Sequence, residues 1–169
     1  MPKPSPNSYP VYFQRYIDLV PENDATTALQ TQSSIIESFL TSIPESKADY
    51  AYAEGKWTLK ELVQHMIDTE RVFSYRALCF ARGEKANLPP FEEDDYAAAS
   101  HANNRNWKNL IEEFITVRKS TEIMFTSFTN DDLEKSGIAN NNVTSVSAVG
   151  FMTAGHFYHH KKVIEERYL

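Results

Sequence analysis

The chain has 169 residues, 41% of them hydrophobic and 24% charged, which predicts a single domain (residues 1–169) with a substantial core. The net charge of −6 argues against non-specific binding to nucleic acid or anionic membranes. Cys79 is the only cysteine, so an intrachain disulfide is excluded and a reducing, cytoplasmic setting is favoured. We find no signal-peptide pattern and no apolar run of about 18–20 residues, and therefore expect neither secretion nor membrane insertion.

The chain begins with an arm and a first helix. Residues 1–10 are rich in proline, serine and asparagine and are interpreted as an arm that neighbouring aromatic residues pack onto the rest of the protein. Asp24 is a suitable N-cap, and apolar residues recur at helical spacing from there until Pro44. The pattern predicts a helix between these two positions.

A second helix and a long connection follow. Thr58 and Glu61 have the spacing of a capping box, and the helix is expected to continue to about residue 83. The connection at 83–104 contains two prolines and the acidic run 92–95, and one helical turn is expected at 96–100. Loops of this length are more often functional than idle; the acidic run is interpreted either as a solvated loop or as a lid.

The C-terminal half predicts two more helices. The third extends over about 104–128, and the segment after it is interrupted by Gly137 and by the asparagines at 140–142. Ser145 or Ser147 then caps a fourth helix that reaches the last residues. No convincing strand pattern is present, so we predict an all-α protein: an antiparallel four-helix bundle with a long connection between helices 2 and 3.

Three histidines suggest a metal site in this bundle. His156 and His160 are four residues apart, so their imidazoles lie on one helix face, about 6 Å apart along the axis, and can converge on one ion. His65 interrupts the apolar face of the second helix and is the natural third ligand. Neutral imidazoles suit Zn²⁺ or Ni²⁺, with Fe²⁺ or Mn²⁺ as alternatives.

The histidine pattern leaves other interpretations open. A single histidine on an apolar face is more often a core residue that hydrogen-bonds the backbone. His159 could replace His160 as a ligand, or could orient a ligand or contact substrate. His101 falls in the long connection and is expected to be solvated.

The residues around the histidines do not form a zincin motif. Those enzymes have a glutamate directly after the first histidine as general base, whereas this chain has Phe157. Three neutral ligands leave the ion's charge uncompensated and an open position for water or for an anion such as a thiolate. Asp68 and Glu70 could orient an imidazole or act as a base; the alternative is that both are surface charges paired with Arg71 or Arg76.

Two motifs connect the chain to a known family. Residues 56–71 (KWTLKELVQHMIDTER) and 154–160 (AGHFYHH) resemble the corresponding helices of the DinB-like superfamily, which includes bacillithiol and mycothiol S-transferases and a mycothiol-dependent isomerase. The stretches at 76–78 (RAL) and 91–96 (FEEDDY) look like the same branch, so the resemblance covers nearly the whole chain.

The resemblance implies an up-down-down-up four-helix bundle, usually a homodimer. It also implies a divalent metal held by His65, His156 and His160. Position 157 is often acidic in close relatives, so Phe157 puts a carboxylate role at that position in doubt.

Three functions are carried forward. The first is a metal-dependent transferase that uses a low-molecular-weight thiol, of bacillithiol S-transferase type, with Arg71, Arg76 and Arg82 as candidates to bind the acidic groups of the thiol. The second is a metal-dependent hydrolase that acts on a small-molecule substrate. The third is a non-catalytic, stress-related metal-binding dimer.

Overall fold

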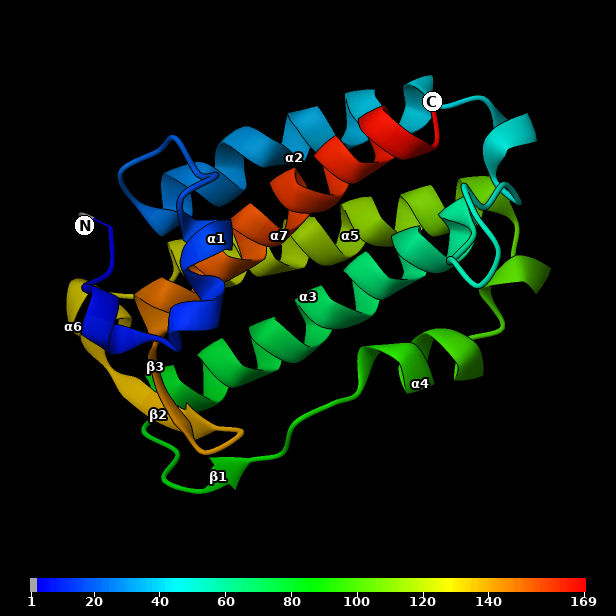
Figure 1. Cartoon of the computed structure of the whole chain (residues 1–169). Helices are drawn as coiled ribbons and strands as arrows, with labels where there is room; N and C mark the ends of the chain where they lie inside the picture. The colour runs from blue at the N-terminus through cyan, green and yellow to red at the C-terminus, as the bar shows by residue number, and fades with distance from the viewer. Residues whose placement is uncertain (1–2) are drawn as a thin grey trace.

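The computed structural model describes residues 3–169 as a bundle of four long helices with a small sheet at one end (Figure 1). The α-helices are α1 (Gln14–Ile17), α2 (Ala25–Ser42), α3 (Leu59–Ala81), α4 (Glu93–Ala99), α5 (Trp107–Thr126), α6 (Asn130–Glu134) and α7 (Val146–Arg167). The short 3-10 helices are η1 (Pro6–Ser8), η2 (Val11–Phe13), η3 (Glu45–Lys47) and η4 (Ala102–Asn104). None of the described helices is long and apolar enough to cross a membrane.

The long helices begin at the capping residues that the sequence predicts. The Asp24 side chain accepts a hydrogen bond from the Thr27 amide at 2.8 Å, at the start of α2. Thr58 and Glu61 form the predicted capping box of α3. Of the two candidates for α7, Ser145 is the cap. These side chains satisfy amides that the first helical turn leaves without partners.

The four long helices have up-down-down-up topology. In Figure 1, α2 and α7 run in one direction and α3 and α5 in the other. The main helix contacts join α3 to α5 and α7, and α2 to the same two helices. Helices α3 and α7, which are far apart in the sequence, therefore lie side by side.

A three-stranded sheet corrects the prediction that the chain has no strands. Its strands are β1 (Asn87–Leu88), β2 (Ser136–Ala139) and β3 (Asn142–Ser145), in the order β1-β2-β3. β1 is parallel to β2, and β2 is antiparallel to β3. Asn140 and Asn141 form the tight turn of the hairpin with φ of 48° and 60°, a conformation that asparagine tolerates better than most residues. Strands this short show too few residues for period-two alternation, which is why the sequence did not reveal them.

The connection between α3 and α5 also differs in detail from the prediction. Its helix, α4, begins at Glu93 and ends at Ala99, so the acidic run is the first turn of the helix rather than a loop before it. α4 packs against α3. The acidic side chains are therefore carried on an ordered element beside the bundle.

The N-terminal segment packs on the bundle, as its aromatic residues suggest. Residues 1 and 2 of the predicted arm lie outside the described residues, while Tyr9 and Tyr16 are buried. Helix α1 contacts α7 so closely that a Cβ atom on Gly155 would lie 2.0 Å from the Tyr16 carbonyl oxygen. Only glycine allows this approach, which brings the Tyr16 ring to 5.6 Å from the His156 ring, centroid to centroid.

A buried polar layer crosses the bundle between two apolar clusters. One cluster is at the sheet end of the bundle and the other is at the opposite end. Between them, Arg118 of α5 donates two hydrogen bonds to Glu70 of α3 and one to Gln32 of α2. Gln32 in turn donates to the Ala154 carbonyl of α7 at 2.9 Å. The network thus connects all four long helices.

Candidate metal centre

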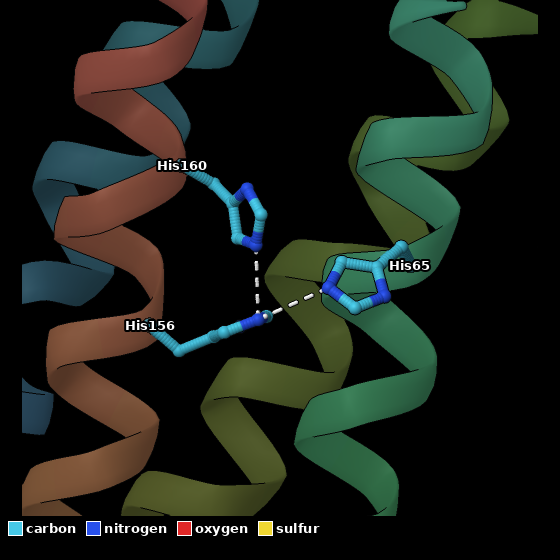
Figure 2. A group of neighbouring side chains, drawn as sticks. All are labelled: His65, His156 and His160. Carbon is cyan, nitrogen blue, oxygen red and sulfur yellow. Dashed lines mark hydrogen bonds between the residues drawn. The ribbon is translucent and has the colours of Figure 1, made fainter. Parts of the chain in front are cut away.

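Three buried imidazoles meet between α3 and α7 (Figure 2). The Nε2 atom of His156 lies 3.1 Å from Nε2 of His65 and 3.0 Å from Nε2 of His160. One ring nitrogen from each residue falls within a group whose members all lie within 4.8 Å of one another. The structure therefore brings together the three histidines selected from the sequence.

The other two histidines, His159 and His101, lie apart from this group. His159 is one residue out of phase with the pair at 156 and 160; it is half-buried and contacts the Tyr16 ring, with a centroid separation of 5.3 Å. His101 is exposed at the start of η4. Neither belongs to the group of converging nitrogens.

Burial keeps the three imidazoles neutral. It lowers the pKa of His65 to about 4, and the nearby His159 adds to the shift. Burial and the neighbouring imidazoles hold the pKa values of His156 and His160 well below the ordinary value. At neutral pH each ring therefore keeps a lone pair that can bind a metal ion.

The carboxylates nearest to His65 in sequence do not serve the imidazoles. Glu70 is 3% exposed and pairs with Arg118, so the prediction of a surface charge paired with Arg71 or Arg76 is wrong for this residue. Asp68 accepts a hydrogen bond from Gln64 at 2.9 Å and lies 4.0 Å from Arg71. Both carboxylates are therefore engaged by partners other than the histidines.

Sequence reasoning did not single out Glu93, yet its carboxylate is beside the site. Its Oε2 lies 4.0 Å from Nε2 of His65, and its side chain is 60% exposed. Partial burial, followed by the charge of Asp94, raises the pKa of Glu93. The available signal was an acidic run within a long connection, which suggested a lid but could not identify the residue that reaches the histidines.

A cavity of about 450 Å³ opens beside His156. Its walls come from the N-terminal segment, α3, the β1–α4 connection, the hairpin and α7. Aromatic side chains, including Tyr16, Phe73 and Phe91, form much of the wall. Of the three imidazoles, His156 lines this cavity and is accessible from it to a small molecule.

The chain matches one known protein family. The family model of the DinB superfamily matches residues 28–164. The chain belongs to the DinB superfamily. No curated protein matches the chain.

Two solved structures share this DinB fold. One is YfiT from Bacillus subtilis, described as a probable metal-dependent hydrolase with an unusual four-helix bundle topology; it has a TM-score of 0.74 and 14% identity, over 97% of this chain and 90% of that one. The other is a mycothiol-dependent maleylpyruvate isomerase, with a TM-score of 0.68 and 13% identity, over 82% of this chain and 58% of that one. At these identities the likeness concerns the fold.

The donor set of this DinB protein fits a divalent metal ion. Tetrahedral coordination with metal–nitrogen bonds of about 2.0–2.1 Å separates two ligand nitrogens by roughly 3.3 Å. The separations of 3.0 and 3.1 Å that involve His156 need only a few tenths of an ångström of adjustment, and all three ligand nitrogens lie within 4.8 Å of one another. Three neutral nitrogens suit a borderline ion such as Zn²⁺ or Ni²⁺ better than Mg²⁺ or Ca²⁺, which prefer oxygen ligands.

Proposed function

We propose that this DinB protein is a metal-dependent transferase that joins a low-molecular-weight thiol to an electrophilic small molecule. The observation that carries the proposal is the convergence of three neutral imidazoles on the edge of a cavity large enough for an organic co-substrate. His65, His156 and His160 would hold Zn²⁺ or Ni²⁺. Because these ligands carry no charge, the site favours an anionic fourth ligand, and a thiolate meets this need.

The residues around the cavity account for the rest of the chemistry. A bound divalent ion would supply Lewis acidity that lowers the pKa of a coordinated thiol. Glu93, next to His65, accepts the proton that the thiol loses. Phe73 and Tyr16 line the site and limit the access of water to the sulfur. The new bond joins sulfur to the electrophilic carbon, whose leaving group departs with its electron pair.

Hydrolysis is the second candidate, and the position of Glu93 favours it. A carboxylate 4.0 Å from Nε2 of His65 is placed to take a proton from a water molecule as well as from a thiol. General bases of this kind contribute about 10²–10⁴ to the rate. Glu93→Gln should therefore lower turnover by a factor in this range and leave the metal content unchanged.

Elemental analysis of protein purified without a histidine tag tests the metal site. We expect about one divalent ion per chain, and near zero in His65→Ala. His159→Ala is the matched control, because His159 is on α7 but outside the converging group, and it should keep the metal. Full metal content in His65→Ala would refute the three-histidine site.

Turnover measurements separate the functions. Transfer predicts that monochlorobimane reacts with bacillithiol or mycothiol, with loss of chloride, and that a chelator stops the reaction. Hydrolysis predicts chelator-sensitive cleavage of esters or amides without added thiol. Protein that binds metal but turns over neither substrate set would support the non-catalytic alternative. The DinB resemblance also leads us to propose a homodimer, which light scattering would test.

A further inference from the structure

The cavity beside the histidines is elongated along α3. Four lining residues, Thr69, Phe73, Arg76 and Phe80, are spaced three or four apart on this helix, so they lie on one face. Arg76 follows His65 by eleven residues, which corresponds to roughly 16 Å along the axis. The cavity thus extends from a histidine end toward a sheet end.

Arg76 lies at the sheet end. Its Nη2 donates a hydrogen bond to the carbonyl oxygen of Pro89 at 2.8 Å, directly after β1. Its guanidinium carbon is 6.0 Å from the centre of the Phe91 ring. These contacts hold the guanidinium in the cavity wall, with its remaining N–H groups available.

No carboxylate neutralises Arg76 among residues 3–169. By contrast, Arg71, Arg105 and Arg118 all form ion pairs. Arg76 is also the one lysine or arginine among the described cavity-lining residues. It is half-buried, and this burial lowers its pKa. A partly desolvated cation without an acidic partner is stabilised when an anion joins it.

We propose that Arg76 binds the carboxylate of an elongated organic anion whose apolar stem lies in the cavity and whose reacting group points to His156. This assignment deepens the proposed function, on which it rests, by naming the substrate class. Phe73, Phe80 and Met152 line the space between the two ends and would contact the stem. Of the three arginines that the sequence offered for binding the acidic groups of a thiol, Arg76 alone lines the cavity.

The position of Glu93 favours one direction of binding for such an anion. Glu93 lines the cavity and is near His65, at the end away from Arg76. In the metal-free protein a carboxylate is repelled by Glu93 and attracted by the Arg76 guanidinium; with a metal ion bound, the thiolate proposed as its fourth ligand would occupy the ion and keep the carboxylate from it. The uncharged, reacting end of the molecule is then directed to the histidines.

Binding of 4-phenylbutyrate tests the proposal, with its uncharged amide, 4-phenylbutyramide, as the matched ligand. Calorimetric titration of the full-length protein is done with EDTA, so that neither metal, thiol nor turnover is involved. Losing a charge-assisted hydrogen-bonded pair should weaken binding of 4-phenylbutyrate to Arg76→Gln by about 10- to 100-fold. Binding of the amide should change less than about twofold. Arg82→Gln, an exposed arginine at the end of α3, should behave as wild type.

The outcomes of this titration are distinct from those for the proposed function. Equal affinity of wild type and Arg76→Gln for 4-phenylbutyrate, or no binding to wild type at 10 mM, overturns the assignment. If Arg76→Gln does not fold, the wild type still decides: raising NaCl from 50 to 500 mM should weaken binding of 4-phenylbutyrate and spare the amide, and equal effects on both refute the site. Binding of 4-phenylbutyrate through Arg76, together with elemental analysis that finds no divalent metal in the protein purified without EDTA, would refute the transferase and leave the Arg76 site standing.

Discussion

Glu70→Leu is expected to lower the free energy of unfolding by about 3–5 kcal/mol, the cost of leaving a buried charge without its partner. Arg118 and Glu70 are 1% and 3% exposed. The guanidinium donates Nε–H and Nη2–H to the two carboxylate oxygens at 2.8 and 2.7 Å. Leucine fills a similar volume but accepts no hydrogen bond, so Arg118 would keep its charge in an apolar surrounding with Gln32 as its one remaining partner.

The loss can be measured by urea denaturation in EDTA, which removes the stabilisation that bound metal would add. For a chain of this length, about 3–5 kcal/mol corresponds to a melting temperature roughly 6–20 °C lower. The double variant Glu70→Leu/Arg118→Met removes both charges, and apolar replacements of buried ion pairs are often neutral or stabilising. Gln32 then lacks a donor, which costs about 1–3 kcal/mol. We expect the double variant to recover about half of the loss.

Two results would refute this reasoning. A loss below about 1 kcal/mol in Glu70→Leu would mean that water or a rearranged side chain compensates Arg118. Losses of Glu70→Leu and of the single variant Arg118→Met that simply add in the double variant would mean that the residues are not coupled, because a coupled pair shows an interaction energy in such a cycle.

Two further predictions concern acidity and packing. In the unfolded chain the imidazoles have a pKa of about 6.5 and become protonated, whereas the buried imidazoles of the folded protein stay neutral. The metal-free protein should therefore lose up to about 1.4 kcal/mol of stability per pH unit for each histidine as the pH falls from about 6.5 to 4. His65, with a pKa of about 4 in the folded state, contributes one such loss. The change of unfolding free energy with pH, measured by urea denaturation, should therefore be smaller by about 1.4 kcal/mol per pH unit in His65→Phe. An unchanged pH dependence would contradict the neutral burial of His65. Gly155→Ala places a Cβ atom 2.0 Å from the Tyr16 carbonyl oxygen and should cost about 1–3 kcal/mol; a melting temperature equal to wild type would show that α1 moves freely.

Much of the fold could be predicted because its signals are local. The caps at Asp24 and Thr58 and the helical periodicity each depend on residues within one or two turns. The i,i+4 spacing likewise places His156 and His160 on one face. His65 joins them because α3 packs against α7. The only sequence signal for this was that His65 is a polar residue on an apolar helix face.

The features that sequence reasoning missed depend on contacts between distant segments. β1 pairs with β2 about fifty residues later, and no local pattern records such a partner. Glu70 was taken for a surface charge because charged residues are rarely buried unless paired, and its partner Arg118 is on another helix. In both cases the pairing of the strand or the burial of the side chain depends on a partner that is distant in the sequence.

The buried polar layer explains why the carboxylate beside the histidines comes from outside the bundle. Phe157 follows His156 directly, but one residue rotates the helix by about 100°, and Phe157 is 1% exposed and packs against Phe114. Position 157 therefore faces the core, near the guanidinium of Arg118, and not the converging nitrogens. Glu70, the other nearby acid, is held by Arg118. Within residues 3–169, the carboxylate that reaches His65 is Glu93, on α4. In this chain the bundle supplies the neutral ligands, and the connection between α3 and α5 supplies the negative charge.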